Sequence, residues 1–328
     1  MKFIPCCTLI LSLAAVLQAV PPVVIAHRGA SGYLPEHTLE AKALAHGMGA
    51  DFLEQDLVLS KDNVPVVLHD IHLDTVTDVA SRFPGRQRAD GRYYALDFTL
   101  AEIKQLRVTE RINAKTGKPI FPGRFPAGQS SFRIPTLEEE LELIAGLNKS
   151  TGRTVGIYPE LKQPAWHRKQ GRDLSSIVLP ILERHGYRTK SDPCWLQCFE
   201  YDEVKRLRDE LNWKGRLLLL MGSGKKGTDG TDFEFLRSSA GLTEVARMVD
   251  GIGPALGSVI GTDGKVTDLV RAAHAQKLVV HPYTVRVDEL PKGVTSLDHL
   301  HRLIFVEASA DGVFTDFPDR TAAFLRIK

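Results

Sequence analysis

Short apolar runs alternate along this chain with longer helical stretches, and this alternation constrains the fold more than any other feature. The expected strands cover residues 23–27, 51–59, 64–69, 154–161, 195–199, 216–221, 250–253, 278–285 and 312–315. The expected helices cover residues 39–47, 137–147, 174–185, 201–211, 235–249, 266–276 and 295–307. Nearly continuous apolar strands separated by helices are typical of a parallel sheet that is covered on both faces.

Nine expected strands are one more than a (β/α)8 barrel contains. The second and third are separated only by residues 60–63, and parallel neighbours need a crossover of a dozen or more residues. We therefore expect these two strands to form an antiparallel hairpin that turns at Asp62 and Asn63. Eight parallel positions remain, so the sequence predicts an α/β protein with a TIM-type (β/α)8 barrel in which one strand is doubled.

Residues from about 74 to 132 interrupt the alternation. This segment is rich in arginine, proline and glycine, and it is too long for an ordinary loop. We interpret it as an insertion at the mouth of the barrel, with a short helix near residues 100–106. Such an insertion would shape the entrance for a substrate. Alternatively, the segment only packs against the barrel and has no role in binding.

The N-terminus has the pattern of a targeting segment. Lys2 precedes a mostly apolar stretch over residues 3–20, which predicts a secretory signal peptide over 1–19 and a mature domain over 20–328. An uncleaved membrane anchor is the alternative. A cleaved leader implies a periplasmic or secreted protein without stable membrane association. Cys194 and Cys198 would lie ~13 Å apart on one strand, too far for a disulfide.

The overall charge argues against nucleic acid as a partner. The 42 lysine and arginine residues nearly balance the 40 acidic residues, which gives a net charge of +2. Such a chain has no strong basic field to hold a polyanion. Any charges that serve function must therefore be local ones.

Charged residues follow several of the expected strands. In a barrel, the C-terminal ends of the strands gather over one mouth. An unpaired ion is costly to bury, so charges at these positions indicate a site. The residues concerned are His27, Arg28, Glu54, Asp56, His69, Glu160 and Lys162.

The expected hairpin refines this site. A two-residue turn at Asp62 and Asn63 would pair Lys61 with Val64, and Asp56 would then face His69. Glu54 lies two residues before Asp56 and points to the same side. One hairpin would thus bring two carboxylates and an imidazole to one patch.

The residue types at this patch are suited to phosphodiester chemistry. Glu54, Asp56 and Glu160 offer only oxygen ligands, which favour Ca²⁺ or Mg²⁺. His27 and His69 are then left as a pair that can give and take protons near neutral pH. A cation beside Arg28 and Lys162 would stabilise the charge that develops on a phosphate.

Each of these residues also has a structural interpretation by itself. A histidine at a strand end is often structural, Glu160 and Lys162 could form a simple salt bridge, and Glu54 and Asp56 could face a solvated rim. Their occurrence together at four strand ends favours the functional interpretation.

The motifs at these positions resemble those of glycerophosphodiester phosphodiesterases. The resemblance runs from about residue 23 to the end of the chain, and the sequence of residues 27–38 is similar to that of the periplasmic bacterial branch. The matching segments are His27-Arg28-Gly29, Pro35-Glu36-His37-Thr38, Glu54-Gln55-Asp56, His69-Asp70, Glu160-Leu161-Lys162, the run 196–199, the run 280–285 and the run 314–318.

The resemblance implies a TIM barrel of the phospholipase C-like phosphodiesterase type with one insertion. It implies hydrolysis of a glycerophosphodiester, such as glycerophosphocholine, to sn-glycerol 3-phosphate and an alcohol, with a bound divalent cation that is typically Ca²⁺. The reaction would begin with attack of the glycerol 2-hydroxyl on phosphorus, and water would then open the cyclic phosphate. A homodimer is suggested by the same resemblance.

Residue roles are also carried over from the resemblance. His27 and His69 become the acid–base pair, and Glu54, Asp56 and Glu160 become the metal ligands. The remaining expected contacts are with substrate: Arg28 and Lys162 with phosphate, Glu36 with the glycerol hydroxyls or as a support of the metal, and Gln197, Phe199 and Tyr283 in the pocket wall. Either Tyr283 or Trp166 would replace the tryptophan that is usual in the family.

Two other functions fit the same sequence. Another phosphodiesterase on this barrel could act on a phospholipid head group, but it would need an exposed apolar rim for membrane docking. The segment 74–132 is instead rich in arginine, aspartate and glycine. A non-catalytic binding protein on an inherited barrel is the second alternative, although no expected catalytic residue is missing.

Overall fold

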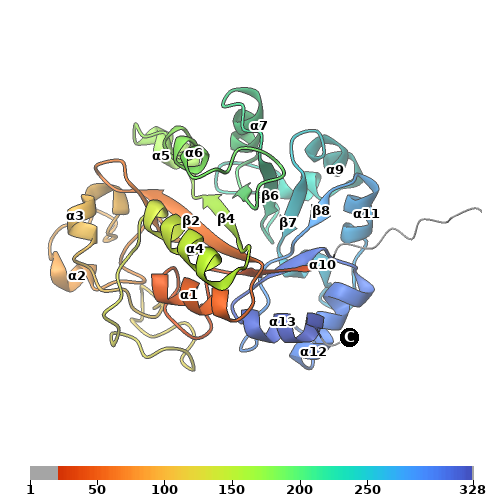
Figure 1. The fold of residues 1–328 in the computed structure, drawn as a ribbon, viewed down its shortest axis with the longest axis horizontal. Coiled ribbons are helices and arrows are strands. Elements are labelled where there is room, and N and C mark those ends of the chain that lie inside the picture. The colour runs from red at the N-terminus through yellow and green to blue at the C-terminus, as the bar shows by residue number, and fades with distance from the viewer. Residues whose placement is uncertain (1–20, 327–328) are drawn as a thin grey trace, which may run out of the picture.

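The computed structural model describes residues 21–326, and the expected leader over 1–19 lies outside this range. All nine expected strands are present (Figure 1). Their bounds are β1 Val23–Ala26, β2 Phe52–Leu59, β3 Pro65–Val67, β4 Gly156–Leu161, β5 Trp195–Cys198, β6 Arg216–Met221, β7 Gly251–Pro254, β8 Val279–Val280 and β9 Gly312–Thr315. Among the described residues, no helix is long and apolar enough to cross a membrane.

Eight of the strands form a parallel barrel. Their order is β8-β7-β6-β5-β4-β2-β1-β9, and β3 pairs with β2 outside this path. The amides of Asp311, Phe314 and Asp316 donate to carbonyls of residues 280–285, which joins the two ends of the order. The predicted TIM barrel is therefore confirmed.

Alternate residues of the strands fill two separate regions. One set forms an aromatic and aliphatic cluster inside the barrel, where Tyr158 stacks on Trp195 with ring centroids 6.0 Å apart. The intervening residues, such as Leu53, Ile157 and Leu196, face the helices and belong to the large outer core. Burial on both faces explains why these strands are continuously apolar in sequence.

The predicted hairpin is present, but its predicted register is wrong by one residue. Leu57 lies opposite Val67, so Asp56 faces Leu68 rather than His69, and the Leu68 amide donates to the Asp56 carbonyl. The connection contains three residues, because the Ser60 amide donates to the carbonyl of Val64. Asn63 adopts a φ of 62°, which is the left-handed conformation that ends such a three-residue loop.

Most helices match their predicted positions. Two long predicted helices are interrupted: the stretch 235–249 begins at Phe233 and divides at the N-cap Ser238, and the stretch 295–307 continues beyond His301 as a π-helix. The α-helices are α1 Leu39–Gly47, α2 Val79–Arg82, α3 Leu100–Ile103, α4 Leu137–Thr151, α5 Pro164–Lys169, α6 Leu174–Arg184, α7 Tyr201–Asp209, α8 Phe233–Leu236, α9 Ser239–Val245, α10 Leu256–Val259, α11 Leu269–Ala275, α12 Leu297–His301 and α13 Pro318–Arg326.

The segment 74–132 contributes to a hydrophobic cluster of its own. Phe98, Ile103 and Leu106 are fully buried there against Val58 and Val66 of the hairpin. In Figure 1 this segment, which carries α2 and α3, lies on the opposite side of the molecule from β7 and β8. The hairpin therefore links this segment to the barrel.

Candidate active site

A sharp turn after β1 begins the site. Arg28 and Gly29 adopt φ values of 60° and 87°, and a Cβ atom at Gly29 would lie 2.9 Å from the backbone of Ala41. Glycine is therefore required at this close approach. The turn directs the backbone N–H of Arg28 to Glu54, and the N–H donates to the Oε2 atom at 2.8 Å.

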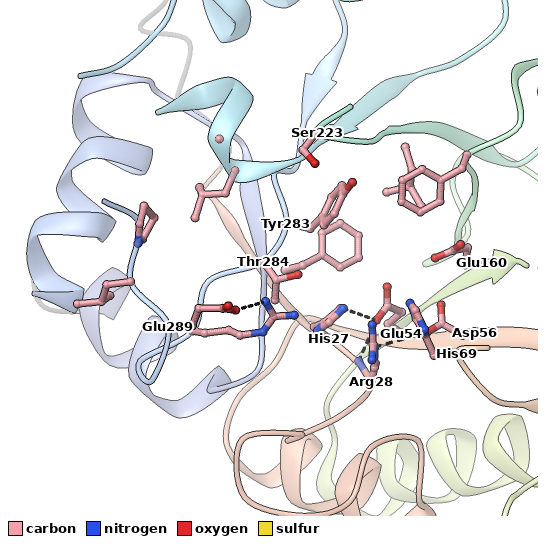
Figure 2. Close-up of a pocket in the computed structure, with 18 residues that line it drawn as sticks. His27, Arg28, Glu54, Asp56, His69, Glu160, Ser223, Tyr283, Thr284 and Glu289 are labelled. Carbon is pink, nitrogen blue, oxygen red and sulfur yellow. Dashed lines mark hydrogen bonds and ion pairs between the residues drawn. The ribbon is translucent and has the colours of Figure 1, made fainter. Parts of the chain in front are cut away.

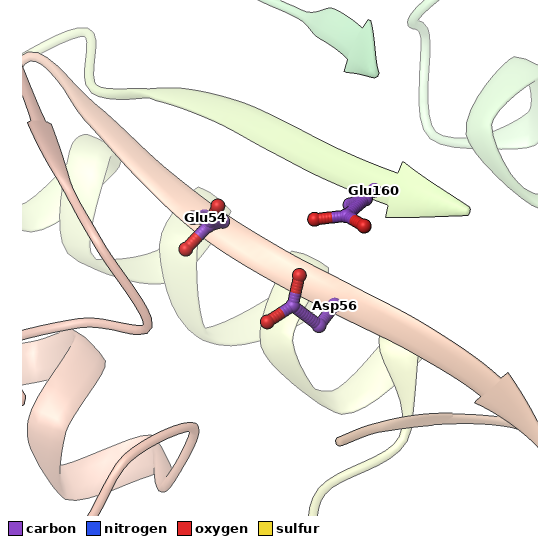
Figure 3. Close-up of side chains that lie close together, drawn as sticks. All are labelled: Glu54, Asp56 and Glu160. Atoms are coloured by element: carbon purple, nitrogen blue, oxygen red, sulfur yellow. The ribbon is translucent and has the colours of Figure 1, made fainter. Parts of the chain in front are cut away.

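Three carboxylates meet beside this turn. Glu54 and Asp56 lie on one face of β2, and Glu160 lies on β4 directly opposite Asp56 (Figure 3). One oxygen of each residue lies within 4.8 Å of the others, and the three residues are 1–4% exposed. The predicted cluster of oxygen ligands is therefore present.

The triad has unbalanced negative charge that fits a cation. Burial, together with Asp56 and Glu160, raises the pKa of Glu54 well above its usual range, and burial raises the pKa of Glu160 to about 8. The Oδ1 atom of Asp56 is buried and has no hydrogen-bond partner among the described residues. A divalent cation would supply this missing partner and favour the ionised carboxylates.

Other buried side chains fix the orientation of the triad. Gln197 donates to Glu54 Oε1 at 3.0 Å, and the ring of His37 contacts Asp56 Oδ2 through Nε2 at 2.6 Å. Lys162 Nζ lies 2.7 Å from Glu160 Oε1 and 4.0 Å from Asp56 Oδ1. Because of these contacts, only some of the carboxylate oxygens of the triad remain available to a ligand in the space between the three side chains.

His27 is oriented by a buried aspartate. Its Nδ1 atom lies 2.5 Å from Asp316 Oδ1, and its Nε2 atom lies 3.9 Å from Glu54 Oε2. Asp316 is held in turn by Arg124 and Arg286, each of which donates to its Oδ2 atom at 2.8 Å. The imidazole therefore presents Nε2 to the carboxylate triad.

His69 is held in the same manner. Its Nδ1 atom lies 2.7 Å from Asp70 Oδ1, and Arg111 donates to Asp70 Oδ2 at 2.6 Å. Arg111 also forms a bidentate pair with Glu36, to which Arg28 donates at 2.9 Å. Both histidines are thus fixed through Nδ1, which leaves Nε2 of each free for proton transfer.

Both imidazoles are held in the neutral form. Burial and the charge of Arg28 lower the pKa of His27 to about 4 and that of His69 to about 3. A neutral imidazole with Nδ1–H donated to a carboxylate has a lone pair on Nε2 and can accept a proton there. An anionic substrate would raise both pKa values and so favour the protonated form that an acid requires.

Two adjoining cavities open beside the histidines. The first chamber has a volume of about 510 Å³ and is lined by the triad, both histidines, Arg28 and an apolar wall (Figure 2). The second chamber has a volume of about 290 Å³ and extends under the segment 74–132. Both chambers are lined by His27, Arg28, His69, Arg286 and Glu289.

The predicted substrate contacts occupy different places. Phe199 and Tyr283 line the first chamber, and Glu36 lines the second. Lys162 lines a third cavity of about 270 Å³ that also reaches His69. Gln197 is fully buried behind Glu54. Trp166 stacks on Tyr94 at 5.6 Å.

Sequence reasoning missed the residues that support the histidines. Asp316 follows β9 directly, and its charge after a buried strand was a usable signal. Arg111 and Arg124 belong to the segment 74–132, which has no periodic pattern to place them. His37 and the fully buried Lys42 behind Asp56 were likewise not given a role.

Comparison with known proteins shows which family this chain resembles. The model of the glycerophosphoryl diester phosphodiesterase family matches residues 27–320. A glycerophosphodiester phosphodiesterase of Haemophilus influenzae is 43% identical over 93% of this chain and 90% of its own length. One from Treponema pallidum is 36% identical over 92% of this chain and 91% of its own.

Solved structures share the fold. A Silicibacter pomeroyi protein, solved as a candidate glycerophosphoryl diester phosphodiesterase, is 25% identical with a TM-score of 0.69 and covers 94% of both chains. A phosphodiesterase of Oleispira antarctica, solved in complex with its product sn-glycerol-3-phosphate, is 22% identical with a TM-score of 0.64. The match covers 93% of this chain and 97% of that one.

Proposed function

This chain belongs to the glycerophosphoryl diester phosphodiesterase family, and we propose that it hydrolyses glycerophosphodiesters to sn-glycerol 3-phosphate and an alcohol. Glycerophosphocholine and glycerophosphoethanolamine are the proposed substrates. The observation that carries the proposal is the pair of aspartate-held histidines beside a buried carboxylate triad. The names of the two bacterial relatives support the same activity.

In this proposal, Glu54, Asp56 and Glu160 hold a divalent cation, and Ca²⁺ is favoured over Mg²⁺. Three carboxylates on two strands, with room beside them in the first chamber, suit the flexible oxygen coordination of Ca²⁺. Such a cation would polarise the phosphoryl oxygens and stabilise their negative charge during transfer.

The remaining charges would bind the phosphate. Arg28 and Lys162 lie beside different oxygens of Asp56: Arg28 Nε is 3.7 Å from Oδ2, and Lys162 Nζ is 4.0 Å from Oδ1. A phosphodiester between them would contact a guanidinium and an ammonium without losing the carboxylate contacts. His27 and His69 would then lie beside the phosphorus, because both line the chamber that contains the triad.

The two histidines would divide the proton transfers. One takes the proton of the glycerol 2-hydroxyl as its oxygen bonds to phosphorus, and the other protonates the alcohol oxygen as its bond to phosphorus breaks. Water then opens the cyclic phosphate with the reverse proton transfers. Attack within one molecule benefits from a high effective concentration. Undiminished hydrolysis of a substrate analogue that lacks the glycerol 2-hydroxyl would contradict this route.

The test is a coupled assay of glycerophosphocholine hydrolysis that detects glycerol 3-phosphate. The protein is treated with EDTA and is then assayed with Ca²⁺ or Mg²⁺ restored, beside His27→Ala and His69→Ala. We expect metal-restored activity in the wild type and a loss of at least ~10²-fold in kcat for each variant.

Two outcomes would overturn parts of this proposal. Activity that persists in EDTA would remove the cation from the mechanism. Inactivity towards every glycerophosphodiester, combined with release of a head group from a phospholipid, would favour the alternative phosphodiesterase function.

We also propose, from the sequence alone, that residues 1–19 are a cleaved leader and that residues 20–328 form the mature domain. We propose further that the protein is periplasmic or secreted and that it forms a homodimer. Mass spectrometry of the mature N-terminus tests the cleavage of the leader, and cell fractionation tests the location. Light scattering of the purified protein tests the dimer, which a monomeric mass would exclude.

A further inference from the structure

The second chamber contains a carboxylate that no part of the mechanism uses. Glu110 lies in the segment 74–132, is only 4% exposed, and lines this chamber beside Glu36 and Arg124. Within residues 21–326, it forms no ion pair, and its Oε2 atom is buried without a hydrogen-bond partner. A buried, unpaired carboxylate is costly, so a ligand that supplies a partner would bind here favourably.

The charges around Glu110 indicate the sign of that ligand. The chamber is lined by four arginines and four carboxylates, and each arginine already lies within hydrogen-bond distance of a carboxylate. Glu36, Glu289 and Asp316 take part in these pairs. Glu110 is the remaining lining carboxylate, so the described chamber has an unmatched negative group rather than an unmatched positive one.

The environment makes this group responsive to a cation. Burial, and then the charge of Glu36, raises the pKa of Glu110 to about 7. A cation beside it would lower the pKa and stabilise the carboxylate form. A neutral ligand would not produce this gain in electrostatic energy.

The second chamber is also placed to receive part of the substrate. It shares His27, Arg28 and His69 with the first chamber, so the two cavities meet where the phosphate is proposed to bind. A phosphodiester has two ester arms. The apolar wall of the first chamber, formed by residues such as Leu256 and Phe314, suits the carbon skeleton of glycerol beside the triad. The second arm can then enter the second chamber.

We propose that the second chamber is the subsite for the alcohol arm of the substrate, and that Glu110 selects alcohols that carry an ammonium group. This inference rests on the proposed glycerophosphodiesterase function and extends it to head-group selectivity. Glu110 is then a specificity residue that makes no contact with the reacting atoms.

The test compares substrates that differ only in the alcohol arm. We would measure kcat/KM for glycerophosphoethanolamine, glycerophosphocholine and glycerophosphoglycerol with the wild type, Glu110→Gln and Glu110→Asp. Glu102→Gln is the matched control, because this carboxylate belongs to the same segment but lines neither chamber. Thermal unfolding of each variant verifies that it is folded.

We expect Glu110→Gln to lower kcat/KM for both ammonium substrates about tenfold while the value for glycerophosphoglycerol changes little. Glu110→Asp, which keeps the charge, should retain most of the preference. An equal loss for all three substrates, or no loss for any, would overturn the assignment of Glu110. Wild-type inactivity towards all three would overturn the proposed function itself, and with it this subsite.

Discussion

The two candidate catalytic histidines are supported by the same arrangement of charges. Asp316 and Asp70 each bind the Nδ1 atom of one histidine, and each is held by an arginine from the segment 74–132. Arg124 serves Asp316, and Arg111 serves Asp70. The segment outside the barrel thus fixes the orientation of both imidazoles, which gives it a role in the site beyond shaping an entrance.

The Asp316→Asn variant tests the importance of this support. An amide can donate to Nδ1 and so favour the tautomer with hydrogen on Nε2, which removes the lone pair that accepts a proton. We expect kcat for glycerophosphocholine to fall by ~10²- to 10⁴-fold with little change in KM. The control is Asp319→Asn. Asp319 lies nearby on helix α13, but it accepts a hydrogen bond from the Tyr33 hydroxyl and does not contact His27. A similar loss in both variants would point to a general disturbance of the structure.

Asp316 should also make stability depend on acid. Although burial acts to raise the pKa of Asp316, its contacts with His27, Arg286 and Arg124 hold it well below the usual range. A carboxyl group with a lowered folded-state pKa stabilises the fold above its unfolded pKa of ~3.9, and this contribution is lost as pH falls towards the folded value. The unfolding temperature of the wild type should therefore fall more steeply below about pH 4 than that of Asp316→Asn. Equal slopes in circular dichroism melts would contradict this expectation.

At the scale of elements, the hairpin shows what residue spacing can and cannot predict. The short connection correctly excluded a parallel pair, because geometry forbids one. The register depended on whether Asn63 was the second turn residue or a third loop residue, and both interpretations use the same residue types. The structure separates them through the hydrogen bond from the Ser60 amide to the Val64 carbonyl, and because Asp62 lacks the positive φ that a two-residue type I′ turn requires. His69 still reaches the site because β3 ends at Val67, so the turn that follows places its side chain.

A buried ion pair joins helices α1 and α4 behind the triad. Lys42 Nζ lies 2.7 Å from Glu140 Oε2, and both side chains are fully inaccessible to solvent. Lys42 also donates to the carbonyl of Glu54 and lies 3.4 Å from His37 Nδ1. These contacts connect the packing of the two helices to the backbone of β2, which carries the candidate metal ligands Glu54 and Asp56.

Removal of one partner should be more damaging than removal of both. We expect Lys42→Met to lower the free energy of unfolding by ~3–5 kcal/mol, because Glu140 would be left buried and unpaired. The double variant Lys42→Met/Glu140→Leu should recover much of this loss in urea unfolding. Glu138→Gln on the same helix disrupts an exposed pair with Arg184 and should cost less than ~1 kcal/mol. A double variant no more stable than Lys42→Met would contradict the expectation.

At the scale of the whole molecule, the barrel and the triad were predictable for one reason. Parallel strands that are buried on both faces are visible as apolar runs, and a closed barrel must bring their C-terminal ends together. His27, Glu54, Asp56 and Glu160 could therefore be grouped without a structure. Arg111, Arg124 and Glu110 could not, because their segment lacks a repeating pattern and its folding depends on contacts with the hairpin.

The triad should also couple cation binding to the stability of the whole barrel. Glu54, Asp56 and Glu160 lie on β2 and β4, two adjacent barrel strands, and their mutual repulsion without a cation opposes the folded state. Ca²⁺ that binds only the folded protein would stabilise it by ~2.7 kcal/mol at a concentration of 100 Kd, which would raise the unfolding temperature by several degrees. The measurement is a thermal melt in EDTA, in Ca²⁺ and in Mg²⁺. Glu160→Gln should lose the response, whereas the buried control Glu200→Gln, which lies outside the triad, should keep it. Equal shifts in wild type and Glu160→Gln would move the cation to another site, and a larger shift with Mg²⁺ would overturn the preference for Ca²⁺.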